Sequence, residues 1–278
     1  VGTATVEVVC PDIDLNAAIF DPEGKVAFAR INTKDLIQGI TDYEVLKDAD
    51  RGIIDMSWDL SGEVLYAADL SDDFTSTLYP LDPATLELTE IGSDSQIAFL
   101  GMAPSTAMPA VSGNENETML TIYGPYLLGI DVSTGTADTG SLVSVEEDID
   151  GTNLIGIAHI EPFEYYDGAL TGDAYFLVDD QSSVYYAMVY QYAGTPYTDV
   201  QKVGSFDAPV NADHYNSLYY DGENLFWSRF CYDTEVASLY MWADLWSEDD
   251  GSIYFLGDFA ESVWPVGGLV RFEFTFLP

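Results

Sequence analysis

One short pattern recurs along the chain: a turn rich in glycine, aspartate or asparagine, followed by a strand of apolar and aromatic residues. It occurs five times, at residues 21–29, 59–68, 116–124, 170–178 and 221–229. Equivalent turn positions in successive copies lie 38, 54, 56 and 50 residues apart. A spacing of about fifty residues accommodates four short strands with their loops. Because one such unit buries little apolar surface alone, the repeat predicts sheets that stack on their neighbours.

A second strand pair follows the copies, with turn residues that suit a hairpin. Examples are Leu78–Thr85, with its turn at Asp82-Pro83, and Leu128–Gly135, with its turn at Ser133-Thr134-Gly135. These residues supply the fixed φ, the side-chain caps and the positive φ that tight turns need. The strands are rich in β-branched and aromatic residues, and long helical patterns are scarce. The sequence therefore predicts an all-β fold, a β-propeller of five to six four-stranded blades.

The repeat also predicts how the blades follow one another. We expect a single propeller domain over 1–278, with blades at about 11–50, 51–94, 95–145, 152–207 and 213–260, and a composite sixth blade from 261–278 with 1–10. The innermost strands are expected at Leu15–Phe20, Ile53–Asp59, Ile97–Ala103, Leu154–Ile160 and Asn216–Tyr220, with Val263–Gly268 as a sixth. Pairing of Leu269–Leu277 with Thr3–Val9 would close the ring and remove a free sheet edge.

The segments Leu78–Thr85 and Leu128–Gly135 resemble the "LY-x-ID-x-x-TG" repeats of bacterial extracellular β-propellers of the PQQ-like and NHL-like superfamily. The resemblance covers roughly Leu15 to Phe272 and implies a fold, because propellers host enzymes, scaffolds and adhesins alike. The five tryptophans have no regular place in the repeat, so a quinone cofactor is not implied. The acidity and aromatic content also resemble modules of large surface proteins of Gram-positive anaerobes. Some of those modules bind host proteins, immunoglobulins included.

The charge balance excludes some classes of partner. The chain of 278 residues has 48 Asp and Glu against 8 Lys and Arg, a formal net charge of -40. Nucleic acid is excluded because phosphate binding needs clustered basic residues, and anionic membranes are disfavoured for the same reason. The longest uncharged run, Ser95 to Asn114, contains two prolines and several hydroxyls, so we expect no membrane insertion. We interpret the chain as a monomeric domain excised from a larger extracellular or cell-surface protein.

Two features leave alternatives open. Cys10 and Cys231 form either one disulfide or two separate thiols, because the sequence does not give their geometry. The loop containing Asp148, Asp150 and Asn153 offers several oxygen ligands, with a glycine that permits a sharp turn. It is either a solvated acidic loop or a structural calcium site, because Ca²⁺ prefers such oxygens. Apart from this calcium, we expect no cofactor.

The sequence contains little that favours catalysis. It has no HExxH, P-loop, GxSxG or CxxC motif, and only two histidines. His159 lies on an expected inner strand and reads as a core or channel histidine. His214 lies in a loop and is either a surface residue or a ligand contact. An enzyme, a lyase or hydrolase with Asp, Tyr and His in the central funnel, is therefore an alternative interpretation.

The density of aromatic residues is the other candidate for a site. Tyr and Trp give large, rigid contact areas at low entropic cost. The candidate binding residues are tyrosines and tryptophans, together with the histidine next to one of them. They are Tyr165, Tyr166, His214, Tyr215, Tyr219, Tyr220, Trp242 and Trp246. We expect a non-catalytic binding module that holds a protein partner, such as a host glycoprotein or an immunoglobulin, with its acidic groups steering a basic surface. A structural spacer module is the remaining alternative.

Overall fold

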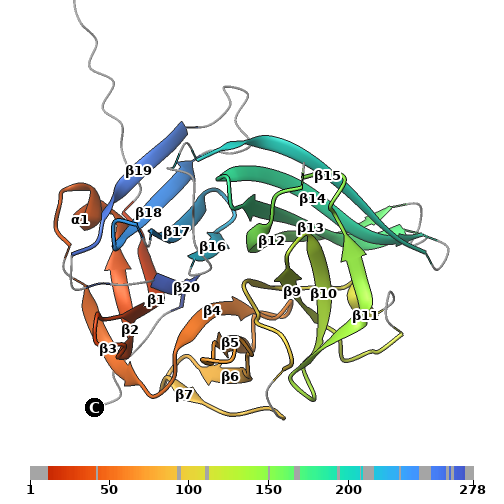
Figure 1. Ribbon diagram of the computed structural model, residues 1–278, viewed down its shortest axis with the longest axis horizontal. Coiled ribbons are helices and arrows are strands. Elements are labelled where there is room, and N and C mark those ends of the chain that lie inside the picture. Colours follow the sequence, from red (N-terminus) through yellow and green to blue (C-terminus); the bar gives the residue numbers. More distant parts are fainter. Residues whose placement is uncertain are drawn as a thin grey trace, which may run out of the picture.

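The repeated strands form five antiparallel sheets of four strands each, arranged around a common centre as the blades of a β-propeller (Figure 1). This computed structural model describes residues 12–41, 43–92, 95–109, 113–149, 151–165, 170–192, 195–206, 208, 216–231, 233–243, 252–260, 263 and 266–272. In the first sheet the strands from the centre outward are β20 (Val266–Val270), β1 (Asp14–Phe20), β2 (Val26–Asn32) and β3 (Glu44–Ala49). A short helix, α1 (Thr33–Ile37), follows β2.

The other four sheets follow the chain directly, each beginning with its innermost strand. The second contains β4 (Ile53–Trp58), β5 (Leu65–Asp69), β6 (Leu78–Asp82) and β7 (Glu87–Leu88). The third contains β8 (Met102–Pro104), β9 (Met119–Tyr123), β10 (Tyr126–Asp131) and β11 (Thr136–Ser144). The fourth contains β12 (Leu154–Tyr165), β13 (Leu170–Asp179), β14 (Ser183–Tyr192) and β15 (Thr195–Ser205). The fifth contains β16 (Asn216–Tyr220), β17 (Leu225–Cys231), β18 (Val236–Ala243) and β19 (Ser252–Asp258).

The ring closes through β20, and this corrects two expectations. Val266–Val270, expected as part of a composite sixth blade, is instead the innermost strand of the first. It pairs with β1, which we expected to be innermost and which is second; Ile19 faces Val266, and Asn16 faces Val270. Burial misled the prediction, because second strands are covered on both faces by neighbouring sheets and read like innermost ones. Thr3–Val9 and most of Leu269–Leu277 lie outside the described residues.

Aspartates hold the turns of the repeat. In three of the copies an aspartate follows a strand and its Oδ1 accepts backbone hydrogen bonds from residues two to five positions later. Asp21 accepts from Glu23 and Lys25 at 2.8 and 2.9 Å. Asp59 and Asp221 form equivalent turns after β4 and β16. Part of the acidity is therefore structural, because these carboxylates satisfy amides that the turn would otherwise leave unpaired.

The hydrophobic core is divided among the five junctions between neighbouring blades. Each buried cluster draws its residues mainly from two adjacent sheets. Between the fourth and fifth sheets, the Phe206 and Trp227 rings lie 5.1 Å apart, centroid to centroid, and Trp227 is fully buried. This arrangement confirms the expected neighbour-on-neighbour packing. None of the helices in the described part of the chain has the length and hydrophobicity needed to span a bilayer.

The innermost strands approach one another so closely that β20 needs glycine. A Cβ at Gly267 would lie 2.6 Å from the carbonyl oxygen of Ile54 and 2.9 Å from that of Ile53. We expect Gly267→Ala to lower the free energy of unfolding by about 1–3 kcal/mol, because it pushes β20 away from β4. Urea unfolding checks this through the midpoint at a constant slope. An unchanged midpoint would show that the ring adjusts without strain.

Candidate central pocket

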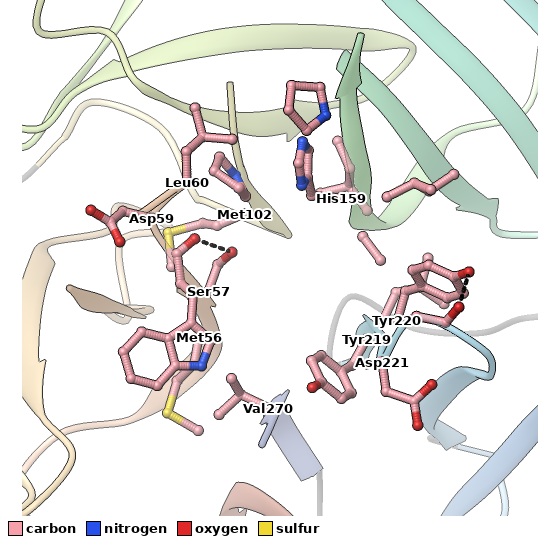
Figure 2. Close-up of a pocket in the computed structure, with 18 residues that line it drawn as sticks. Met56, Ser57, Asp59, Leu60, Met102, His159, Tyr219, Tyr220, Asp221 and Val270 are labelled. Atoms are coloured by element: carbon pink, nitrogen blue, oxygen red, sulfur yellow. Dashed lines mark hydrogen bonds between the residues drawn. The ribbon is translucent and has the colours of Figure 1, made fainter. Parts of the chain in front are cut away.

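A pocket of about 390 Å³ opens at the centre of the ring, and the innermost strand of every blade contributes to its wall (Figure 2). Its size falls within the range of small-ligand pockets, roughly 300–1,000 Å³. The residues that line it are Met56–Leu60, Met102, Pro104, Ile157–Ile160, Pro162, Leu218–Gly222 and Val270. The pocket therefore lies where the innermost strands end and the turns after β4 and β16 begin.

Aromatic side chains form part of the wall. Trp58 lies at the end of β4, and its indole Nε1 donates a hydrogen bond of 3.2 Å to the carbonyl oxygen of Arg271. Tyr219 and Tyr220 come from the end of β16 and lie together on one side of the pocket (Figure 2). The Tyr220 hydroxyl donates to the Gly222 carbonyl at 2.6 Å. These contacts fix ring orientations at the mouth of the pocket.

The hydroxyl of Tyr219 is uncharged in this setting. Burial raises the pKa of Tyr219 to about 12. The negative charge of Asp221 adds to this rise, and the positive charge of Arg271 opposes it. The Tyr219 ring also stacks on Phe226, with centroids 6.4 Å apart and planes inclined by 22°. Tyr219 therefore stays neutral near neutral pH, and its ring is held by stacking on Phe226.

His159 lies on the wall of the pocket and is held by a buried carboxylate behind it. Its Nε2 lies 3.3 Å from Oδ1 of Asp173, whose side chain is completely buried on β13. The other Asp173 oxygen accepts hydrogen bonds from the backbone and hydroxyl of Thr106 at 2.6 and 3.0 Å, and from the amide of Ala107 at 3.1 Å. Asp173 thus joins the third and fourth blades while it orients the imidazole.

A second buried carboxylate, Asp55, ties the innermost strands together. Its Oδ2 accepts a hydrogen bond of 2.5 Å from the Met102 amide, and its Oδ1 accepts one of 2.7 Å from the Ser217 hydroxyl. The Ser217 oxygen in turn accepts from the Leu269 amide at 2.9 Å. One carboxyl group therefore connects β4 to β8 and β16 directly, and to β20 through a hydroxyl.

Burial governs the ionisation of Asp55. The side chain is 2% exposed, and desolvation raises its pKa from 3.8 to about 7. The hydrogen bonds from Ser217 and Met102 favour the charged form, and they offset only part of this rise. Asp55 is thus close to half-protonated at neutral pH.

The structure separates the aromatic residues that the sequence nominated. Tyr219 and Tyr220 both line the pocket, and each is half-buried. Trp242 is a correction: it is 6% exposed and packs with Phe206 between the fourth and fifth blades, so no partner can reach it. Tyr165 ends β12. The other four nominated residues, Tyr166, His214, Tyr215 and Trp246, lie outside the described residues.

The predicted calcium ligands are described only in part. Asp148 is exposed, and the Asn153 amide donates to Asp180 at 3.1 Å, while Asp150 lies outside the described residues. In the described ranges, no three His, Cys, Asp or Glu side chains are grouped so that they could hold a metal ion. Cys231 is a free thiol, and Cys10 lies outside the described part of the chain. The calcium site stays a prediction.

Sequence reasoning missed most of the pocket. Trp58 was noted only for its irregular place in the repeat, although it ends the strand before the Asp59 turn. Asp55 and Asp173 stand inside apolar strands, where a charged residue is unusual unless it has partners. A charged residue among apolar neighbours was therefore the signal that the sequence offered for Asp55 and Asp173. His159 was expected as a core or channel residue, and it lies in the wall of the central pocket.

Comparisons with known proteins assign this chain to no family. No protein-family model matches the sequence, and no curated protein is significantly similar to it. TolB from Acinetobacter baumannii aligns with a TM-score of 0.41 and 10% identity over 92% of this chain; the chain spans only 65% of that protein. A protein assigned as TolB from Agrobacterium tumefaciens aligns with a TM-score of 0.40 and 11% identity, over 93% of this chain and 92% of that protein. A protein assigned as a 6-phosphogluconolactonase from Bacteroides uniformis aligns with a TM-score of 0.40 and 13% identity. The alignment covers 92% of this chain and 84% of that protein.

Proposed function

We propose that this chain is a non-catalytic binding module of a secreted or cell-surface protein, and that it holds a protein partner at the mouth of the central pocket. The β-propeller fold suits such a role because loops and strand ends from all blades meet at one surface. The observation that carries the proposal is the pocket itself, with aromatic residues from two strands at its wall. Tyrosine and tryptophan are the residues that most often dominate binding energy at interfaces.

An apolar rim supports a protein partner. Leu60 lies within the Asp59 turn, is 41% exposed and lines the mouth of the pocket. Trp58 and Tyr220 lie at the same mouth and are half-buried, so parts of both rings remain open to contact. A pocket with aromatic walls and an exposed apolar rim can bury an anchor side chain of a partner and exclude water around it.

The partner is proposed to carry a basic surface. The net charge of -40 would attract such a surface from solution and accelerate encounter. An immunoglobulin or another host glycoprotein is the first candidate, as the resemblance to bacterial surface modules suggests. An extracellular or cell-surface location belongs to the same proposal.

Retention of partners by immobilised protein tests the proposal. Leu60→Arg places a long charged side chain across the rim, and Val45→Arg is its matched control on the outermost strand β3, where Val45 is 50% exposed. Pooled immunoglobulin and serum proteins are passed over the native chain and both variants. We expect saturable retention by the native chain and by Val45→Arg, and a loss of about tenfold or more in affinity with Leu60→Arg.

Two results would contradict this function. Equal retention by Leu60→Arg and Val45→Arg would place any binding away from the pocket. The absence of every saturable partner would favour the spacer module instead. Retention of serum proteins other than immunoglobulin, with the same dependence on Leu60, would keep the function and replace the candidate partner.

An enzyme is the second candidate, and the pair of His159 and Asp173 favours it. A carboxylate behind an imidazole is the arrangement that orients a general base in hydrolases and lyases. The pair ranks second because, among the described lining residues, Ser57 is the one serine and its hydroxyl donates to a backbone carbonyl at 3.3 Å. Turnover of esters, lactones or glycosides that His159→Gln abolishes would reverse the ranking.

A further inference from the structure

We propose that the central pocket receives the cationic end of a lysine or arginine side chain supplied by the protein partner. This inference rests on the proposed function and specifies which group of the partner enters the pocket. The charge of the pocket, the chemistry of its walls and its size lead to the same class of ligand.

The charge around the pocket favours a cation. Asp59 and Asp221 lie on opposite sides of it (Figure 2), and none of the described lining residues is a lysine or arginine. The hydrogen bonds within their own turns hold both carboxylates in place. An anionic group would approach these fixed charges and a chain of net charge -40, whereas a cation is attracted by both.

The walls suit a cation that carries an apolar stem. Trp58 and Tyr219 contribute aromatic rings to the wall, and such rings attract ammonium and guanidinium groups through the ring quadrupole. Met56 and Met102 add flexible thioethers that pack against methylene groups. Lysine and arginine bury such methylene stems while they keep the charged end near polar groups. A free inorganic cation would leave these apolar walls without contact.

The volume of the pocket suits one side chain. A volume of about 390 Å³ lies at the lower end of the range for small-ligand sites, which is roughly 300–1,000 Å³. Next to the pocket, the Met102 amide donates a hydrogen bond of 2.5 Å to the buried Asp55 carboxyl, which holds the inner strands β4 and β8 together. An anchor in the pocket would bring the flanking residues of the partner against Leu60, which is 41% exposed, and Tyr220.

Arg271 allows the sign of the ligand charge to be tested. It is exposed, it follows the lining residue Val270, and its charge lowers the pKa of Tyr219. Its carbonyl oxygen accepts the hydrogen bond of the lining residue Trp58, so Arg271 lies next to the pocket wall and its positive charge opposes the entry of a cation. Arg271→Gln should tighten the binding of a cationic ligand, whereas it should weaken the binding of an anionic one.

The experiment uses four short peptides, Gly-Gly-X-Gly-Gly, in which X is lysine, arginine, norleucine or glutamate. Binding to the full chain is measured by calorimetry and by NMR at about 0.15 M salt, where long-range attraction is screened. We expect saturable one-site binding of the lysine or the arginine peptide, and affinity for the norleucine peptide that is at least about tenfold lower. Comparing lysine with arginine shows which of the two cations the pocket prefers.

Three variants locate the binding. Arg271→Gln should tighten the cationic peptides by roughly threefold. Lys25→Gln removes the same charge from the turn after β1, at the end of the first sheet opposite Val270, and should leave affinity unchanged. Leu60→Arg should abolish binding while Val45→Arg retains it.

The inference fails under any of four results. Three of them are equal affinity for norleucine and lysine, tighter binding of the glutamate peptide that weakens in Arg271→Gln, and cationic binding that Leu60→Arg leaves intact. The fourth is that none of the peptides binds to the native chain. If the Leu60-dependent partner is still retained in that case, the proposed function stands and only the cationic anchor is wrong. If no partner is retained either, both fail.

Discussion

Replacing Asp55 with asparagine is expected to remove a loss of stability that the native chain suffers as the pH rises toward neutrality. The folded-state pKa of about 7 exceeds the value of 3.8 for a free carboxyl, so the folded state binds a proton that the unfolded state has released. Stability that depends on this proton is present at low pH and declines between about pH 4 and pH 7. Between pH 5 and pH 9 the decline amounts to about 3 kcal/mol.

The asparagine variant keeps the shape and an acceptor oxygen for the Met102 amide, but it carries no titrating proton. We therefore expect the stability of Asp55→Asn relative to the native chain to increase by about 3 kcal/mol between pH 5 and pH 9. Urea unfolding at several pH values measures this difference. Asp72→Asn, in an exposed turn after β5, is the control for the loss of one negative charge. Parallel curves for Asp55→Asn and the native chain would contradict the prediction.

Removal of the Asp173 carboxylate is expected to be more damaging than removal of any exposed carboxylate. In Asp173→Ala the Thr106 amide loses its acceptor in a part-buried position, and the hydroxyls of Ser105 and Thr106 lose theirs as well, while the buried Ala107 amide keeps only its bond to Ser105 Oγ. Leaving such donors unpaired costs about 1–3 kcal/mol each, so we expect a total loss of at least about 3 kcal/mol. Asp173→Asn retains an acceptor oxygen and should lose less.

Urea unfolding with the same control site tests this expectation. Asp72→Ala should change the free energy of unfolding by about 0.5 kcal/mol or less, because exposed substitutions are usually mild. If Asp173→Ala proved as stable as Asp72→Ala, the hydrogen bonds between the third and fourth blades would be unimportant to the fold. The imidazole of His159 would also lose its hydrogen-bonding partner in Asp173→Ala.

The candidate site shows where sequence reasoning succeeds. The doublet at Tyr219 and Tyr220 was identified because tyrosine is unusually suited to contact surfaces, and both residues line the pocket. Trp242 had the same signal and is buried. The difference arises from position in the blade: Trp242 lies on the third strand, opposite Leu225, and faces the neighbouring sheet. Residue type alone does not distinguish a rim aromatic from one between blades.

The repeat of turns and strands was enough to determine the fold class, because turn chemistry and strand composition act over a few residues. The aspartates at 21, 59 and 221 illustrate this, since each carboxylate accepts hydrogen bonds from residues of its own turn. Ring closure and the pocket were decided by contacts between residues far apart in the chain. Ser217 and Asp55 are 162 positions apart and share one hydrogen bond. Such meetings depend on how all five blades pack together, and no local pattern encodes that packing.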